Sequence, residues 1–264
     1  MADERPAVRV ERDGDVASIV LDSPPLNLFG DAVFTGLSAS IDEVEASDAR
    51  AVVWRAEGDV FTGGVDVNVF QRVVDAGGER PGDTFEPLLS VVQRIEALEV
   101  PTLALVHGLC LTAGLEVSLG CDMIWASESA RFGLVEAVVG LTPGAGGTQR
   151  MAERAGPARA REFVMSGGLY DAATLERWNV VNRVLPDGEL HEKGMRFAGK
   201  LASGPTKAHG ATKRIVRGFL EGGIDRADEL TAETAGSLFA TEDLQNAVRS
   251  FLSEGPGNAK FEGR

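Results

Sequence analysis

Cysteine and histidine are scarce in this sequence, and their spacing fits no common metal site. The 264 residues include two cysteines, Cys110 and Cys121, and three histidines, His107, His191 and His209. Neither the paired CxxC spacing of zinc sites nor the HExxH pattern of metalloproteases occurs. We therefore expect no bound metal, and we interpret the two cysteines as reduced, buried thiols rather than a disulfide.

Long apolar runs are also missing. No segment of about 18 apolar residues is present, so the sequence predicts no membrane-spanning helix. Residues 1–12 are charged and lack an apolar core, which is not typical of a secretory signal. Apolar residues make up 44% of the chain and charged residues 25%, as in an ordinary globular protein. These features predict a soluble, cytoplasmic protein that has no membrane partner.

Basic residues are outnumbered by acidic ones. The chain has 26 Lys and Arg against 40 Asp and Glu, a net charge of −14, which argues against a nucleic-acid partner. One segment departs from this balance, because residues 193–220 contain no acidic residue but seven basic ones: Lys193, Arg196, Lys200, Lys207, Lys213, Arg214 and Arg217. This basic stripe is either a solvated helix face that balances acidic neighbours or a seat for a polyanionic ligand or an acidic face of another subunit.

Short apolar runs alternate with helical patterns over the first two thirds of the chain. Strands are predicted at residues 16–21, 51–54, 102–106, 123–126 and 180–185, and helices at 31–46, 85–98 and 113–119. Such short apolar strands are typical of a mainly parallel sheet that is buried on both faces. Residues 75–83 are predicted to form a loop. Only helical patterns follow the last strand, at residues 189–203, 205–220, 225–238 and 242–253.

The glycines concentrate in three segments, each placed after a predicted strand. These segments are residues 61–66, 107–116 and 140–150. None contains the GxGxxG pattern of dinucleotide-binding proteins or the Gly-Lys-Ser/Thr ending of a P-loop, which excludes dehydrogenase and NTPase functions. Gly-rich turns instead let backbone N–H groups approach a ligand oxygen, and two such groups can form an oxyanion hole. The second segment leads into a helix, whose N-terminus favours negative charge.

Taken together, the motifs resemble those of the crotonase family, the enoyl-CoA hydratase/isomerase superfamily. The likeness covers nearly the whole chain, and its most specific part is Pro-Gly-Ala-Gly-Gly-Thr-Gln-Arg at residues 143–150. Supporting pieces lie in order along the sequence, at residues 23–27, 61–66, 107–116, 120–122 and 131–136. The resemblance implies an α/β fold, a crotonase-like spiral of ββα turns over residues 1–190. An all-helical trimerisation subdomain that also covers the CoA would follow over residues 191–264.

The resemblance also assigns the site. It implies an acyl-CoA thioester substrate whose carbonyl oxygen binds the backbone N–H groups of Val65 and Ala113. Two glutamates flank the catalytic water in hydratases of the family, and Glu116 and Glu136 occupy these positions, the first as base and the second as acid. The resemblance assigns CoA binding to Gly63, Gly64, Asp66, Gly114, Lys213 and Lys260. No cofactor is expected, because the CoA is part of the substrate.

The residues themselves agree with these roles for the glutamates. Glu116 lies in an apolar helical run, and Glu136 lies between apolar residues on both sides. Burial raises the pKa of a carboxyl group, and a second carboxylate nearby raises one of the two further. Such a pair suits acid–base chemistry near neutral pH, although each glutamate could instead be a surface or salt-bridged residue.

Two departures from the family pattern bear on the substrate. Thr112 and Ala113 replace the first two of three glycines that hydratases usually carry, so the Ala113 methyl group could narrow the acyl site. Asn68 stands where family members often have a lysine that could contact the CoA phosphates. The leading hypothesis is an enoyl-CoA hydratase of fatty acid metabolism, assembled as a trimer or a dimer of trimers. The alternatives are an enoyl-CoA isomerase that uses Glu136 and a non-catalytic acyl-CoA-binding protein.

Overall fold

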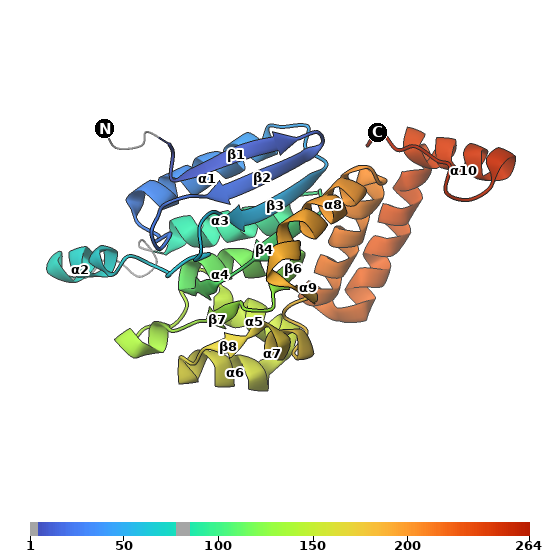
Figure 1. The fold of residues 1–264 in the computed structure, drawn as a ribbon. Helices are drawn as coiled ribbons and strands as arrows, with labels where there is room; N and C mark the ends of the chain where they lie inside the picture. The colour runs from blue at the N-terminus through green and yellow to red at the C-terminus, as the bar shows by residue number, and fades with distance from the viewer. Residues whose placement is uncertain (1–4, 78–84) are drawn as a thin grey trace.

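A six-stranded sheet forms the centre of the molecule in the computed structural model, which describes residues 5–77 and 85–264 (Figure 1). Its strands lie in the order β1-β2-β3-β4-β6-β9, in which β1 and β2 are antiparallel and all other neighbours are parallel. Their bounds are Val8–Asp13, Val16–Leu21, Ala51–Ala56, Thr102–Val106, Met123–Ser127 and Arg183–Leu185. A smaller sheet joins β5 (Leu109–Leu111), β7 (Arg131–Gly133) and β8 (Tyr170–Asp171).

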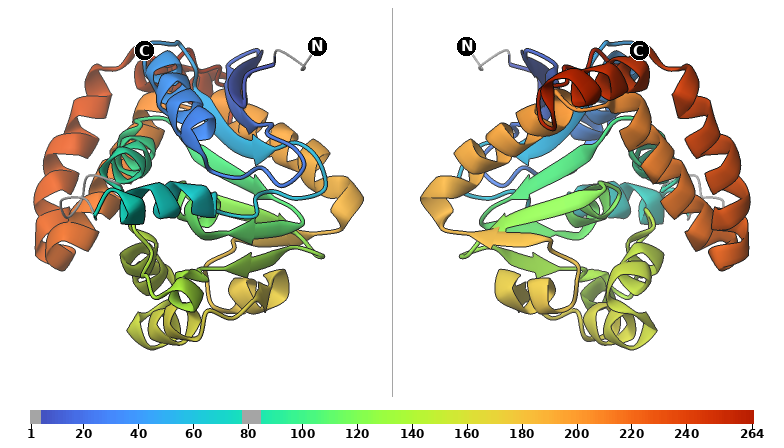
Figure 2. Two further views of the ribbon diagram at one scale, coloured as in Figure 1. Left: turned by 90° about the vertical axis from the view of Figure 1, so that its left-hand side faces the viewer. Right: turned by 90° about the vertical axis from the view of Figure 1, so that its right-hand side faces the viewer.

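Helices cover both faces of the central sheet, as the apolar strands predict (Figure 2). One face packs on α1 (Asp31–Glu45), α3 (Glu86–Ala97) and α4 (Thr112–Leu119). The opposite face packs on α8 (Leu190–Ala202), where Trp125 of β6 stacks on Phe197 with 4.6 Å between ring centroids. The remaining helices of the α/β part are α2, α5, α6 and α7, which span Val67–Asp75, Gly147–Ala155, Pro157–Ser166 and Ala172–Arg177.

The C-terminal part is helical and extends away from the sheets. The two helices predicted on either side of residue 222 belong to α9 (Thr206–Ser237), which turns back on itself at Gly222 and Gly223. The turn uses a positive φ of 73° at Gly223, which glycine adopts at little cost. The two halves lie side by side, because a Cβ at Gly218 would overlap Leu230, and α10 (Glu242–Glu254) continues outward (Figure 1).

The final residues of the chain return to the body of the protein. Asp243 of α10 accepts hydrogen bonds from the N–H groups of Glu262 and Gly263 at 2.7 and 2.9 Å. Arg50, directly before β3, donates to the carbonyl oxygen of Phe261 at 3.0 Å. These bonds tie the tail to α10 and to the loop that enters the central sheet.

The sequence missed several elements. Strand β1 was not expected because charged residues alternate with its valines, as befits an edge strand with one exposed face. Helices α5 to α7 and 3₁₀ helix η1 (Glu136–Val139) lie next to glycines, which favour turns and loops. The predicted strand at 180–185 shortens to β9, and the predicted loop at 75–83 extends into residues outside the described ones. The division at residue 190 stays a prediction, and α8 beyond it packs on the sheet.

Candidate active site

Glu116 lies on α4 and is buried, with its side chain held by a loop from the next part of the chain. Its Oε1 accepts hydrogen bonds from the backbone N–H groups of Ala145 and Gly147, at 2.8 and 2.9 Å. Burial raises the pKa of the Glu116 carboxyl, and these two N–H groups and the charge of Arg150 oppose that rise. Both bonds go to Oε1, so Oε2 of Glu116 keeps its lone pairs for another donor.

Arg150 fixes the loop that holds Glu116. The Arg150 guanidinium donates a hydrogen bond to the carbonyl oxygen of Gly146 at 3.2 Å, and it forms a bidentate ion pair with Glu96 of α3. Gly146 has a φ of 93°, and a Cβ there would overlap the Arg150 guanidinium. Only glycine therefore fits this position, which explains the second glycine of the 143–150 motif.

Glu136 begins η1 and faces the same cavity from the other side. Its side chain is buried, and Oε2 has no hydrogen-bond partner among the described residues. Burial raises the pKa of Glu136 to about 7, with a backbone N–H bond opposing the rise and the nearby charge of Glu116 contributing to it. An unpaired buried carboxyl oxygen is unfavourable unless a ligand or water completes it, and such groups mark functional sites.

A cavity of about 20 Å³ lies between the two glutamates, and Val65 also lines it. A cavity needs roughly 10–15 Å³ to hold one water molecule, so this one has room for water beside the two carboxyl groups. Apart from Thr142, the rest of the wall is apolar, and it includes the aromatic side chains of Phe34, Phe70 and Phe85. The structure thus brings together the predicted pair Glu116 and Glu136 with one of the two predicted oxyanion residues.

The second predicted oxyanion residue, Ala113, lies in the first turn of α4. Its N–H therefore has no partner within the helix, and the helix dipole makes this end attractive to a negative oxygen. The Val65 N–H donates to Oγ1 of Thr112 at 3.1 Å, so this amide already has a hydrogen-bond partner within the chain.

Two threonines lock the loops that carry these amides. Oγ1 of Thr62 accepts from the Gly64 N–H at 2.9 Å and donates to the Asn27 carbonyl at 2.7 Å. A Cβ at Gly64 would overlap Oγ1 of Thr112, and a Cβ at Gly114 would overlap the methyl group of Thr62. Each threonine thus occupies the space left free by a glycine of the other loop. Gly64 and Gly114 therefore serve loop packing, whatever their predicted contacts with CoA.

The other residues predicted to bind CoA lie in different places. Gly63 donates to the carbonyl oxygen of Leu26 at 2.7 Å, and Asp66 caps α2 by accepting from the Asn68 N–H at 3.0 Å. Lys213 forms an ion pair with Asp122 at 2.8 Å and donates to a backbone carbonyl, so the structure does not bring it to the glutamates. Lys260 is exposed on the C-terminal tail, and neither lysine lines the cavity.

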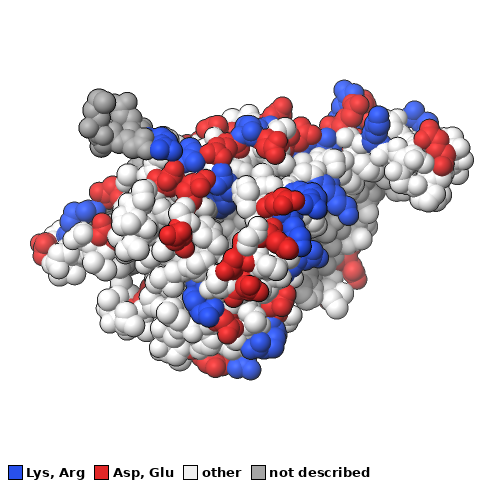
Figure 3. Space-filling view, viewed as in Figure 1, with Lys and Arg blue, Asp and Glu red and all other residues white. Residues whose placement is uncertain are grey.

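Ion pairs account for much of the basic stripe. Lys193 and Arg196 pair with Glu189 and Glu192 one turn earlier, and Arg217 pairs with Glu221 at 3.0 Å. On the face in Figure 3, basic and acidic side chains lie next to each other over α8. These pairs match the interpretation in which the stripe balances acidic neighbours, since the partners lie just outside the acid-free segment.

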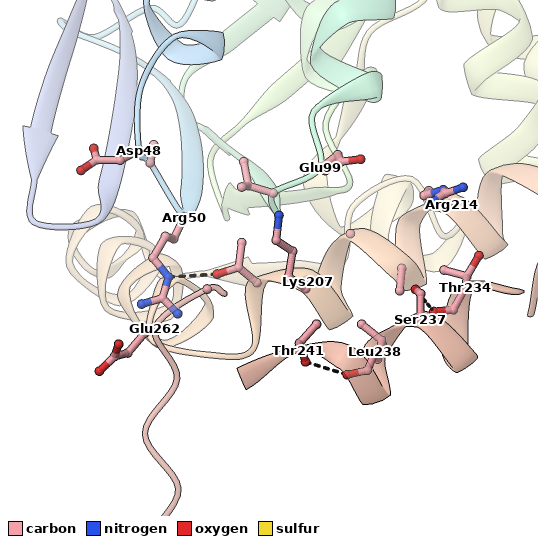
Figure 4. A pocket seen from close by; sticks show the side chains of 16 residues that line it. Asp48, Arg50, Glu99, Lys207, Arg214, Thr234, Ser237, Leu238, Thr241 and Glu262 are labelled. Atoms are coloured by element: carbon pink, nitrogen blue, oxygen red, sulfur yellow. Dashed lines mark hydrogen bonds between the residues drawn. The ribbon is translucent and has the colours of Figure 1, made fainter. Parts of the chain in front are cut away.

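A larger cavity, of about 450 Å³, lies at the C-terminal tail and contains neither glutamate (Figure 4). Arg50, Lys207 and Arg214 line it together with Asp48, Glu99 and Glu262, so its charges of opposite sign balance. The Oγ1 of Thr234, another lining residue, is buried without a hydrogen-bond partner among the described residues. The cavity shares no lining residue with the one between the glutamates.

Three further expectations concern the cysteines, metal ligands and membrane-spanning helices. Cys110 and Cys121 are free and buried, as expected, and burial raises the pKa of the Cys121 thiol to about 12. Within residues 5–77 and 85–264, no three His, Cys, Asp or Glu side chains group as metal ligands. In the same part of the chain, no helix is both long and apolar enough to cross a bilayer.

Comparison with known proteins agrees with these features. Residues 11–264 match the family model described as enoyl-CoA hydratase/isomerase. The chain is 30% identical over 250 residues to a short-chain-enoyl-CoA hydratase of Clostridium acetobutylicum, covering 94% of this chain and 95% of the relative. It is 31% identical over 247 residues to a probable enoyl-CoA hydratase of Rhizobium meliloti, covering 93% and 94%.

The fold agrees as well. A solved structure of an enoyl-CoA hydratase subunit I from Geobacillus kaustophilus superposes with a TM-score of 0.88 at 28% identity, covering 99% of this chain and all of the other. The expected crotonase-like fold is therefore confirmed. The chain belongs to the enoyl-CoA hydratase/isomerase family.

Proposed function

We propose that the protein is an enoyl-CoA hydratase that adds water across the double bond of a 2-enoyl-CoA thioester. The observation that carries the proposal is the cavity with room for water beside Glu116 and Glu136. Acyl-CoA is the substrate class that membership of the family implies. An isomerase needs only one group to move a proton, so a buried pair around a water site favours hydration.

The two glutamates have different surroundings, which supports different roles. The N–H groups of Ala145 and Gly147 and the charge of Arg150 favour the ionised form of Glu116, as a general base requires. Glu136 has an unpaired oxygen and a pKa of about 7, so a large fraction carries a proton at neutral pH, as a general acid requires. Two carboxyl groups whose environments push their pKa values apart are suited to acid and base roles.

The reaction then follows from these positions. Glu116 takes a proton from the water, and the resulting hydroxide adds to the β-carbon of the enoyl group. Electron density moves onto the thioester oxygen, where the free N–H of Ala113 at the start of α4 stabilises the negative charge. Glu136 delivers its proton to the α-carbon, which gives the 3-hydroxyacyl thioester.

Glutamine variants test the assignment. Glutamine keeps the size of glutamate but cannot exchange a proton, so Glu116→Gln and Glu136→Gln should each slow hydration by roughly 10²–10⁴-fold. An isomerase would respond asymmetrically on a 3-enoyl-CoA of the same chain length, losing activity in Glu136→Gln and keeping most of it in Glu116→Gln. A parent protein that binds acyl-CoA but transforms neither substrate would point to the binding-protein alternative.

We also propose that the protein self-associates through its C-terminal helices, as a trimer or a dimer of trimers. Large apolar side chains on α9, η3 (Leu238–Ala240) and α10 are exposed in the single chain: Phe219, Leu220, Ile224, Phe239, Phe251 and Leu252. Exposed apolar surface of this extent is typical of contact with another protein surface.

A further inference from the structure

Thr112 is the most strained feature of the candidate site. It has a φ of 44°, in the left-handed region, where a β-branched residue is a genuine outlier. Such a residue persists in this conformation only where the surrounding structure holds it there. Glycine, which hydratases of the family usually carry at this position, would adopt the same backbone without that strain. Strained residues cluster at functional sites, so the conformation of Thr112 beside the predicted oxyanion residues points to a functional role.

The surroundings of Thr112 fix where its hydroxyl group points. The side chain is 8% exposed, and its Oγ1 lies so close to Gly64 that any side chain there would overlap it. The two side-chain branches at Cβ also restrict rotation about χ1. Oγ1 therefore stays on the Val65 N–H, which donates to it at 3.1 Å.

The proton of this hydroxyl group is available to a ligand. A threonine hydroxyl can accept and donate at the same time, and Oγ1 uses a lone pair on Val65. Within residues 5–77 and 85–264, the hydroxyl group of Thr112 donates no hydrogen bond, and its Oγ1 only accepts one. The next residue along the chain is Ala113, whose N–H is also free of helical partners. A hydroxyl proton and a backbone amide proton thus lie on consecutive residues, beside the cavity that Val65 lines.

We propose that Thr112 is a catalytic residue whose hydroxyl group donates a hydrogen bond to the thioester oxygen, together with the Ala113 N–H. The Val65 N–H then acts on the substrate through this hydroxyl group rather than directly. By donating to Oγ1 it polarises the O–H bond, and a chain of hydrogen bonds strengthens each member. The inference rests on the proposed function for its chemistry, since a stronger bond to the enolate oxygen than to the ground-state carbonyl accelerates the reaction.

Three variants test the proposal by turnover. Thr112→Ala removes the hydroxyl group and keeps the backbone N–H groups, and it should lower kcat for hydration by about 10²–10³-fold, the usual effect of losing one oxyanion donor. Thr112→Ser keeps the hydroxyl group and should stay within about tenfold of the parent. Thr234→Ala is the matched control, because it removes a buried threonine hydroxyl from the separate cavity at the C-terminal tail.

A binding measurement separates this proposal from the proposed function. Cinnamoyl-CoA absorbs at longer wavelength when its carbonyl oxygen is polarised, whether or not the enzyme turns it over. We expect a red shift on binding to the parent, to Thr112→Ser and to Thr234→Ala, and a clearly smaller one with Thr112→Ala. A parent that gives this pattern without hydrating any enoyl-CoA would overturn the proposed function and support the role of Thr112.

The opposite results overturn the proposal. If Thr112→Ala binds cinnamoyl-CoA with the full red shift and hydrates as fast as the parent or faster, the hydroxyl group only occupies the place of the thioester oxygen. The Val65 N–H would then contact the substrate directly once the hydroxyl group is removed. A folded Thr112→Ser variant as slow as Thr112→Ala would also contradict it, because the hydroxyl group alone would not suffice.

Discussion

The buried, unpaired carboxyl of Glu136 should make the protein less stable as the pH rises, and Glu136→Gln should remove that effect. The pKa of Glu136 lies at about 7 instead of 4.5, chiefly because of burial. Each tenfold change in a proton equilibrium is worth about 1.4 kcal/mol, so the full effect is on the order of 3 kcal/mol. The folded state holds the proton more tightly than the unfolded state, so stability falls as the pH rises from 4.5 to about 7.

The free energy of unfolding of Glu136→Gln should therefore rise relative to that of the parent as the pH increases. At pH 5.5 roughly two fifths of the effect is present, and above pH 8 nearly all of it, so the variant should gain about 2 kcal/mol relative to the parent between pH 5.5 and pH 8.5. Urea unfolding at one fixed protein concentration measures this difference. The lower pH stays above the pI of about 4.7, where association is strongest.

An exposed glutamate provides the control. Glu43 lies on the solvent side of α1, so Glu43→Gln should leave the free energy of unfolding close to the parent value at both pH values. A Glu136→Gln variant whose difference from the parent is the same at pH 5.5 and pH 8.5 would refute the reasoning. A variant that is less stable than the parent at pH 8.5 would do so as well, because Glu136 would then have a partner that favours its ionised form.

Three further predictions follow from the loop, the lysines and the C-terminal helices. Gly146→Ala should lower the stability by about 1–3 kcal/mol and slow hydration, because its Cβ would overlap Arg150 and disturb the loop that holds Glu116. A variant that unfolds at the parent temperature and keeps the parent kcat would contradict this. Lys213→Ala should lower the stability by about 1 kcal/mol with little change in KM, because it removes a partly buried ion pair while Asp122 keeps its two hydrogen bonds from Thr102. Lys260→Ala should raise KM if the tail contacts CoA, and a raised KM in a fully stable Lys213→Ala variant would instead place Lys213 on the CoA. Light scattering at micromolar concentration should give a trimer or a dimer of trimers, and a monomer would rule out self-association through α9 and α10.

The sequence predicted four strands of the central sheet well because each of these four is a short, largely buried apolar run bounded by turn residues. Strands β2 and β4 have the predicted bounds, and β3 and β6 extend them by one or two residues. Helices α5 to α7 could not be predicted in the same way, since α6 and α7 begin beside Gly156 and Asp171 and pack through only a few buried residues. In these segments packing against the smaller sheet, rather than local propensity, decides the structure.

The site was predicted less evenly. Glu116 and Glu136 were assigned by the family resemblance, and their apolar sequence surroundings agreed with it because carboxyl groups are unusual there. The structure places both at one cavity. The contact between Thr112 and Val65 could not, because it joins residues 47 positions apart whose loops meet only in the folded chain. Lys213 was assigned to CoA from the family resemblance and lies in the basic stripe, but its ion-pair partner Asp122 comes from a distant turn. Charge patterns along one helix do not reveal such partners.

The central claim is that Glu116 and Glu136 add a water molecule to an enoyl thioester. Incubating the parent protein with a 2-enoyl-CoA in ¹⁸O-labelled water tests it most directly, with mass spectrometry of the acyl product. The account predicts a 3-hydroxyacyl-CoA that carries one labelled oxygen, and it predicts that both Glu116→Gln and Glu136→Gln form this product at least about 10²-fold more slowly. A parent that shifts the double bond without taking up the label, or a Glu116→Gln variant that incorporates it at the parent rate, would contradict the account.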